Sequence, residues 1–161
     1  MKDNNATPNT TSVQVSYRYN STNGSKSTKT TVDKYIYEMI CKKKGVSDGQ
    51  SFITDLARRI REEEPNRWAG HLRESLILEL INKEYTVGYT ISPDYKKVLC
   101  TNNLGASVPV NIPSSLHFAL TSFFNGMSPN PSISEIYSLV DGSDTINKSS
   151  ELRKILLQRL L

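Results

Sequence analysis

The chain lacks the residues and segments that several classes of protein require. It has only two cysteines in 161 residues, Cys41 and Cys100, which are too few for a disulfide framework or a structural zinc site. Both lie in apolar segments, so we expect small buried thiols. No apolar run approaches the roughly 20 residues that span a bilayer. The amino terminus lacks the apolar core of a signal peptide, which predicts a cytoplasmic protein without membrane contact.

The sequence also lacks the short motifs that carry catalysis. It contains no Walker loop, dinucleotide fingerprint, nucleophile elbow or paired histidine and cysteine ligands. No set of Ser, His and Asp residues suggests a nucleophilic triad. We therefore expect a protein that is not an enzyme and that uses neither a metal nor an organic cofactor.

Charge is the most informative feature of the composition. The net charge is +4, and the length of 161 residues suits one domain or two small ones that share a core. Hydrophobic residues make up 37% of the chain, which is low for a globular protein but too high for general disorder. Residues 1–61 hold 11 Lys and Arg against 5 Asp and Glu, whereas the remainder holds 9 against 11. This skew suggests a surface that faces a polyanion, although a solvated basic face accounts for the charge equally well.

The first third of the chain predicts a hairpin. Residues 1–11 have the composition of a disordered tail. Residues 12–19 alternate strictly, with Val13, Val15, Tyr17 and Tyr19 on one face, which is typical of a half-buried strand. An Asn-Gly turn signal follows, and residues 26–32 then return as the second strand.

Helices are expected after this hairpin. Asp33 predicts the cap of a helix over 34–44 that ends at Gly45, and Ser47 or Asp48 predicts the cap of the next helix, which ends before Pro65. A third helix is expected within 67–84. Another hairpin is predicted within 85–101 and a strand at 106–112, followed by helices near 114–126, 131–140 and 147–161.

The order of these elements suggests an internal duplication. Val15 and Tyr17 match Val87 and Tyr89, 72 residues later, while Gly45 matches Gly126. The segments "LRESLILELI" and "LRKILLQRLL" begin 80 residues apart, at Leu72 and Leu152. We therefore predict two units, residues 12–84 and 85–161, which share one core, with an insertion near 101–106 in the second unit.

A strand that runs into a helix, a turn opened by Gly-x-Ser and a second helix together resemble the ribbon-helix-helix family of DNA-binding proteins. The matching segments are "STKTTVDKYIYEMICKKKGVSDGQSFITDLARRI" and "SVPVNIPSSLHFALTSFFNGMSPNPSISEIYSLV". Two copies in one chain look like the single-chain, pseudo-dimeric members found among plasmid-transfer and relaxosome accessory proteins. The resemblance implies an α+β, mainly helical fold. The fold would consist of two pseudo-symmetric strand-helix-helix units, with added hairpins and third helices. Each unit would contribute one strand to a two-stranded ribbon that enters the major groove.

Candidate DNA-contacting residues follow from the alternation of the two strands. If Val32 points inward, then Ser27, Lys29 and Thr31 point outward, and Ser107 and Asn111 do so in the second unit. A register shifted by one residue would present Lys26 and Thr28 instead. Basic residues and the start of the second helix complete the expected contacts, namely Arg18, Lys42, Lys43, Lys44 and Ser47.

The sequence therefore predicts a sequence-selective binder of double-stranded DNA, acting as a transcriptional repressor or as an accessory factor in plasmid maintenance or conjugation. Its expected partners are duplex DNA and other DNA-processing proteins, and we expect a monomeric pseudo-dimer or a further homo-oligomer. One alternative is an adaptor whose basic half binds an acidic protein. Another is a single-strand binder that stacks bases on Tyr17, Tyr19, Tyr85 and Tyr89, although these tyrosines also fit the core of half-buried strands.

Overall fold

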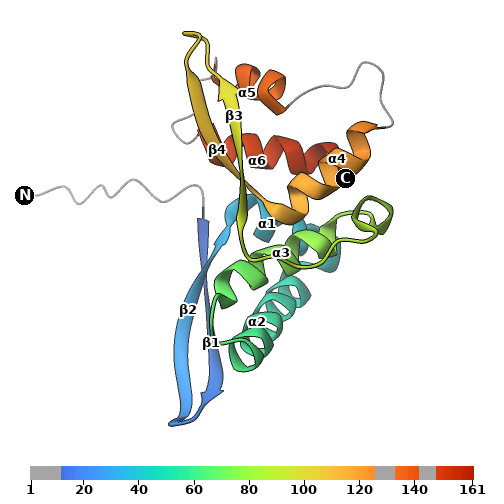
Figure 1. Cartoon of the computed structure of the whole chain (residues 1–161). Helices are drawn as coiled ribbons and strands as arrows, with labels where there is room; N and C mark the ends of the chain where they lie inside the picture. The colour runs from blue at the N-terminus through green and yellow to red at the C-terminus, as the bar shows by residue number, and fades with distance from the viewer. Residues whose placement is uncertain (1–11, 126–132, 142–147) are drawn as a thin grey trace, which may run out of the picture.

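Two β-hairpins, each followed by three helices, make up the fold. The computed structural model describes residues 12–125, 133–141 and 148–161 (Figure 1). The predicted tail at 1–11 and Gly126 of the predicted repeat lie outside these ranges. The elements in chain order are β1 (Ser12–Ser21), β2 (Gly24–Asp33), α1 (Lys34–Lys44), α2 (Val46–Glu63), α3 (Trp68–Leu80), the short 3₁₀ helix η1 (Lys83–Thr86), β3 (Tyr95–Thr101), β4 (Ser107–Pro113), α4 (Ser114–Asn125), α5 (Ile133–Asp141) and α6 (Lys148–Arg159). The α+β, mainly helical class predicted from the sequence is confirmed.

The first hairpin forms as predicted. Strands β1 and β2 pair antiparallel from Ser12↔Asp33 to Ser21↔Gly24, across a turn at residues 22–23. Gly24 adopts a φ of 102°, a conformation that side chains other than glycine rarely reach. The apolar face predicted for residues 12–19 is turned inward, where Val15 and Tyr17 are buried and α2 packs against β1.

Helix α1 has the predicted bounds, but the start of α2 differs from the prediction. Gly45 ends α1 with a φ of 90°, and α2 begins directly at Val46. The expected caps at Ser47 or Asp48 are therefore wrong, because both residues already lie in the first turn of α2. Ile53, Ala57 and Ile60 are buried and form the apolar stripe of α2.

The second hairpin lies later in the chain than predicted. Residues 85–94 do not form a strand, and β3 pairs instead with β4, from Tyr95↔Pro113 to Thr101↔Ser107. The alternation at Val87 and Tyr89 is misleading because Gly88 between them has a φ of 82°. Val87 is 76% exposed, whereas the hydroxyl of Tyr89 is bound by Glu74.

The ribbon implied by the resemblance, with one strand from each unit, does not form among the described residues. Strand β2 pairs with β1, and β4 pairs with β3, in two separate two-stranded sheets. Each hairpin therefore forms its ladder of hydrogen bonds within its own half, rather than with a strand of the other half.

Burial recurs along the chain at a spacing of 80 residues. Residues that occupy the core of the first half have buried counterparts in the second half, as in the pairs Val32/Ile112, Ile36/Leu116, Ile40/Leu120, Leu56/Ile136, Ile60/Val140, Leu72/Leu152, Leu76/Leu156 and Ile77/Leu157. The expected match of Val15 to Val87 is wrong. In the register of the hairpins, β3 corresponds to β1 at a spacing of 83, because cross-strand partners are three residues closer in sequence in the second hairpin: Val15 pairs with Thr30, whereas Val98 pairs with Val110. An internal duplication predicts this pattern.

The two hairpins are also anchored in the same way. The backbone N–H of Asn20 donates to Glu62 near the end of α2, at 2.7 Å, and the backbone N–H of Asn103 donates to Asp141 at the end of α5, also at 2.7 Å. The hydrogen bonds from Asn103 and from Lys148 hold the pKa of the Asp141 carboxyl below its usual value. Each hairpin is thus tied at its far end to the second helix of its own half.

A buried carboxylate joins the two halves. Glu74 of α3 is fully buried and accepts hydrogen bonds from the backbone N–H of Ser115 at 3.0 Å, from the Ser115 hydroxyl and from the hydroxyl of Tyr89. Because Ser115 lies at the amino end of α4, the carboxylate also faces the positive end of that helix dipole. Apolar residues from both halves surround this point in one continuous core. Among the described residues, no helix has both the length and the apolarity that crossing a membrane requires.

We predict that Glu74→Ala strongly destabilises the protein. The substitution leaves the Ser115 N–H, the Ser115 hydroxyl and the Tyr89 hydroxyl without their shared acceptor and opens a cavity. The free energy of unfolding should therefore fall by about 3 kcal/mol or more. Urea denaturation followed by circular dichroism measures this loss.

The matched control for this experiment is Glu38→Ala. Glu38 is an exposed glutamate on α1 that forms an ion pair with Lys34 at 3.8 Å. Its replacement should change the free energy of unfolding by less than about 0.5 kcal/mol. Equal effects of the two substitutions would show that Glu74 does not hold the halves together.

A second prediction tests whether the two halves share one core. Leu76 and Leu156 are fully buried at corresponding positions of α3 and α6. Leu76→Ala and Leu156→Ala should each cost about 2–5 kcal/mol and should each lower the melting temperature of one cooperative transition. Two transitions in calorimetry, with each variant shifting only one of them, would contradict a shared core. The exposed Leu139, replaced by alanine, serves as the control.

Candidate nucleic-acid interface

The outer face of the first hairpin is a continuous polar surface, which we call the ribbon face. Its side chains come from alternate positions of both strands and lie in four cross-strand pairs, Gln14↔Thr31, Ser16↔Lys29, Arg18↔Ser27 and Asn20↔Ser25. All eight residues are exposed. None carries a negative charge, and two carry a positive charge.

The alternation of the strands explains why this face is polar. The opposite face presents Val13, Val15 and Tyr17 from β1 together with Val32 from β2, and it packs against the helices. Because successive side chains point to opposite sides, every second residue is left for solvent. The expected orientation, with Val32 inward and with Ser27, Lys29 and Thr31 outward, is confirmed. The shifted register is wrong, since Lys26 lies opposite Tyr19 on the other face.

Arg18 and Lys29 are the two cations of the ribbon face. They lie diagonally across the strands, because Arg18 pairs with Ser27 and Lys29 pairs with Ser16. Between them lies a shallow hollow of about 340 Å³. Within the described residues, neither side chain forms an ion pair, and Arg18 is held only by a 3.4 Å hydrogen bond from its Nε to Ser25. Both charges therefore face solvent and can approach an anion.

The hairpin is supported from behind by an aromatic cluster. The guanidinium of Arg61 lies over the rings of Tyr19 and Trp68, at 4.8 Å and 4.3 Å from their centroids, and Tyr17 makes an edge contact with Trp68 at 6.4 Å. These contacts fix the inner face to α2 and α3. The ribbon face therefore lies on a hairpin whose other face is packed against helices, rather than on a free loop.

The second hairpin carries a different outer face. Ser107 and Asn111 are exposed there, as expected, opposite Thr101 and Lys97. However, Leu99 on the same face is 66% exposed. Figure 1 shows the tips of the two hairpins at opposite ends of the molecule, so the structure does not bring Ser107 and Asn111 together with the ribbon face.

Two of the three lysines at the end of α1 that were expected to contact DNA bind a residue of the protein instead. Lys43 and Lys44 reach Glu79 of α3, at 3.5 Å and 3.0 Å, and Lys44 also lies over the ring of Phe52. Burial acts to raise the pKa of Glu79, but the hydrogen bonds and charges of Lys44 and Lys43 hold it below its usual value. Two of the three lysines are therefore engaged within the protein.

Lys42 and Ser47 complete the expected set. Lys42 is exposed on α1, and Ser47 is exposed in the first turn of α2. Asp48 lies in that same turn and places a carboxylate beside the amide end that a phosphate would approach. This end of α2 is thus a weaker candidate for phosphate contact than the sequence indicated.

The four tyrosines named for base stacking make contacts inside the protein. Tyr17 is buried, and the ring of Tyr19 lies 6.3 Å from that of Tyr17. Tyr85 makes an edge contact with Phe123 at 5.3 Å, and Tyr89 lies against Phe118 at 5.2 Å. This arrangement agrees with their interpretation as packing residues, and it offers no row of exposed rings to a single strand.

Four residues of the ribbon face were not among the expected contacts, namely Gln14, Ser16, Asn20 and Ser25. The signal for them was present in the sequence. Once β1 and β2 form one hairpin, the alternate positions of β1 must share a face with Ser27, Lys29 and Thr31.

No model of a known protein family matches the chain, and no curated protein or solved structure resembles it at a significant level. The resemblance to the ribbon-helix-helix family therefore rests on the sequence pattern alone. The function has to be argued from the geometry of the chain itself.

Proposed function

We propose that the protein binds double-stranded DNA by inserting the first hairpin into the major groove. The observation that supports this proposal is the ribbon face, a two-stranded antiparallel surface of eight exposed polar side chains with two cations and no acidic residue. The proposed ribbon consists of β1 and β2 of one half, rather than one strand from each half. The role as a repressor or as a plasmid accessory factor stays a prediction.

The dimensions of the hairpin suit this target. The major groove is wide enough to admit a two-stranded β-ribbon, and each base pair presents a distinct pattern of donors and acceptors there. Gln14, Asn20 and the hydroxyl-bearing side chains of the ribbon face both donate and accept hydrogen bonds. Arg18 can form two hydrogen bonds with one guanine, and Lys29 can contact a phosphate or a guanine. Positioning and base recognition are thus available on the same face.

A second candidate function is protein-protein interaction through the second hairpin. Leu99 and Leu104 of this hairpin are 66% and 92% exposed, and Leu139 of the adjacent α5 is 71% exposed. Leu99 lies on the outer face of the second hairpin, and α5 packs against strand β3 of the same hairpin. Large apolar side chains left exposed on a hairpin and on the helix that supports it favour a protein contact. The two functions use different hairpins and are compatible with each other.

The central test is Lys29→Glu. This change places a negative charge on the ribbon face, so the affinity for duplex DNA should fall about tenfold or more, which corresponds to roughly 1.4 kcal/mol. The free energy of unfolding should change by less than about 0.5 kcal/mol, because the side chain is exposed. Fluorescence anisotropy with a pool of random-sequence duplexes measures the binding.

Lys26→Glu is the matched control for this test. Lys26 is exposed on the same strand but points to the other face of the hairpin, so its reversal changes the net charge equally without altering the ribbon face. Equal losses of affinity in the two variants would show that overall charge, and not the position of Lys29 on the ribbon face, determines DNA binding. Unchanged duplex binding in both Lys29→Glu and Arg18→Glu would remove the ribbon face as the contact surface.

The dependence of binding on salt provides a further prediction. Each phosphate that a cation neutralises contributes about −0.9 to the slope of log K against log salt concentration on duplex DNA. Lys29→Gln should therefore make the slope less negative by about one, whereas Lys26→Gln should leave it unchanged. A wild-type affinity that does not vary between 50 and 200 mM salt, salt concentrations at which such contacts lose affinity steeply, would exclude phosphate contacts and favour the protein-interaction candidate.

A further inference from the structure

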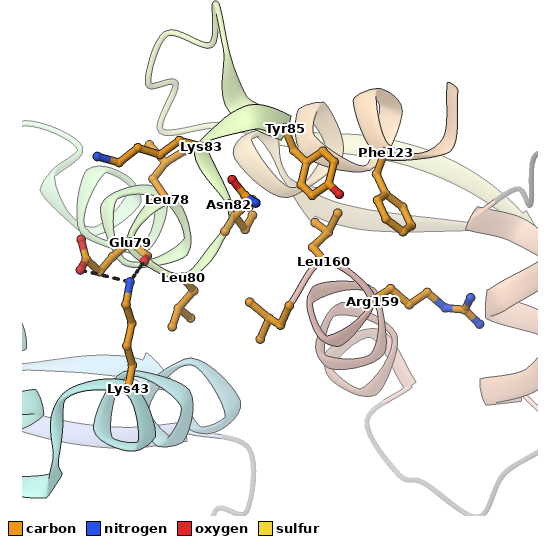
Figure 2. Close-up of a pocket in the computed structure, with 12 residues that line it drawn as sticks. Lys43, Leu78, Glu79, Leu80, Asn82, Lys83, Tyr85, Phe123, Arg159 and Leu160 are labelled. Atoms are coloured by element: carbon orange, nitrogen blue, oxygen red, sulfur yellow. Dashed lines mark hydrogen bonds and ion pairs between the residues drawn. The ribbon is translucent and has the colours of Figure 1, made fainter. Parts of the chain in front are cut away.

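A cleft of about 700 Å³ lies where the carboxyl ends of helices from the two halves meet, away from the ribbon face. Figure 2 shows the residues that line it. The first half contributes Lys43 of α1 and the end of α3 with η1, and the second half contributes Phe123 of α4 and the residues that end and follow α6. This volume lies within the range of about 300–1,000 Å³ that is usual for small-molecule sites.

The inner surface of the cleft is apolar and partly aromatic. Tyr85, Phe123 and Leu160 lie together on one side of it, and Leu80 lies apart from them (Figure 2). The rings of Tyr85 and Phe123 meet edge to face at 5.3 Å, which sets the shape of one wall. These side chains come from separate elements, so the surface depends on the fold and can enclose the body of an apolar molecule.

Positive charges surround this apolar surface. Lys43, Lys83 and Arg159 line the cleft together with one acidic side chain, that of Glu79. Glu79 already binds Lys43 and also Lys44. Lys83 and Arg159 are exposed, and Figure 2 shows them on opposite sides of the apolar side chains. The charged side chains that line the cleft therefore sum to a net positive charge.

Corresponding positions of the two halves have different chemistry at this site. At the spacing of 80 residues, Lys43 corresponds to Phe123 and Glu79 corresponds to Arg159, whereas Leu80 corresponds to Leu160. The shared leucines maintain the apolar interior. The Lys43/Phe123 pair places a cation on one wall and an aromatic ring on the other, and the Glu79/Arg159 pair places opposite charges on the two walls.

We propose that this cleft binds a small organic anion with an apolar body, such as an aromatic or acyl carboxylate. The body would lie against Phe123, Tyr85 and the leucines, and the acid group would pair with Lys83 or Arg159. The inference is independent of the proposed DNA binding, because none of these residues belongs to the ribbon face.

Two fluorescent probes with the same apolar body test the proposal. 1-Anilinonaphthalene-8-sulfonate carries a sulfonate, and N-phenyl-1-naphthylamine is its uncharged counterpart. The folded full chain should bind one molecule of the sulfonate saturably and about tenfold or more tighter than the neutral probe, because only the sulfonate can pair with the rim cations. Fluorescence titration and isothermal calorimetry measure affinity and stoichiometry.

Two variants separate the charge from the apolar surface. Lys83→Glu combined with Arg159→Glu should remove the preference for the sulfonate while retaining the neutral probe. Lys96→Glu combined with Lys97→Glu makes the same change in net charge outside the cleft, on exposed residues of β3, and should retain the preference. Phe123→Ala should weaken both probes, with thermal melting to verify that the variant remains folded.

Other results would overturn the proposal. Absence of saturable binding would do so, as would equal affinity for the two probes or sulfonate binding that the Lys83 and Arg159 reversals leave unchanged. A concentration-dependent dimer that the Phe123 variant abolishes would assign the cleft to a second copy of the chain instead. Light scattering of the wild type and the variant detects that outcome.

Discussion

The arrangement of the molecule depends on one buried carboxylate. Glu74 is fully buried on α3 and binds both the amino end of α4, through Ser115, and Tyr89 in the segment between the halves. A carboxylate removed from water is costly unless its oxygens receive hydrogen bonds, so this position is stable only when all three segments are in place. Moving α4 away from α3 would leave the charge without its donors. The orientation of the second half, and with it the separation of the two hairpins, follows from this constraint.

Around Glu74, the cores of the two halves are packed by residues at corresponding positions. The buried positions of β2, α1, α2 and α3 recur 80 residues later in β4, α4, α5 and α6. A hairpin alone buries too little apolar surface to be stable in water, and each one here is backed by the helices of its own half. Glu74 breaks the correspondence, because the residue 80 positions later is Lys154. The halves are thus alike in their cores and different at the point where they join.

Local features of the fold could be predicted from the sequence, and long-range choices could not. The helix at 34–44 was predictable because Ile36 and Ile40 mark its buried side and Gly45 ends it with a positive φ. The orientation of Lys29 followed from simple alternation. The pattern of residues 85–94 wrongly predicts a strand, because Val87 and Tyr89 alternate like strand residues although the Tyr89 hydroxyl binds a carboxylate 15 residues away in sequence. Glu74 had no signal at all, since a single glutamate in an amphipathic segment normally faces solvent. Whether β2 pairs with β1 or with a strand of the other half is likewise decided by the whole fold rather than by either strand.

The strongest argument for a functional ribbon face comes from comparing the two hairpins. Both are two-stranded and antiparallel, and both are packed by the second helix of their half, so their outer faces are under the same structural constraints. Yet the position of Lys29 is taken by Pro109 in the second hairpin, and the position of Ser16 is taken by Leu99. Packing cannot account for this difference, because all four residues are exposed. A proline removes a backbone donor and an exposed leucine favours apolar contact, whereas the first hairpin keeps only polar and cationic side chains. The difference agrees with the proposed functions, in which the first hairpin meets a polyanion and the second meets an apolar protein surface.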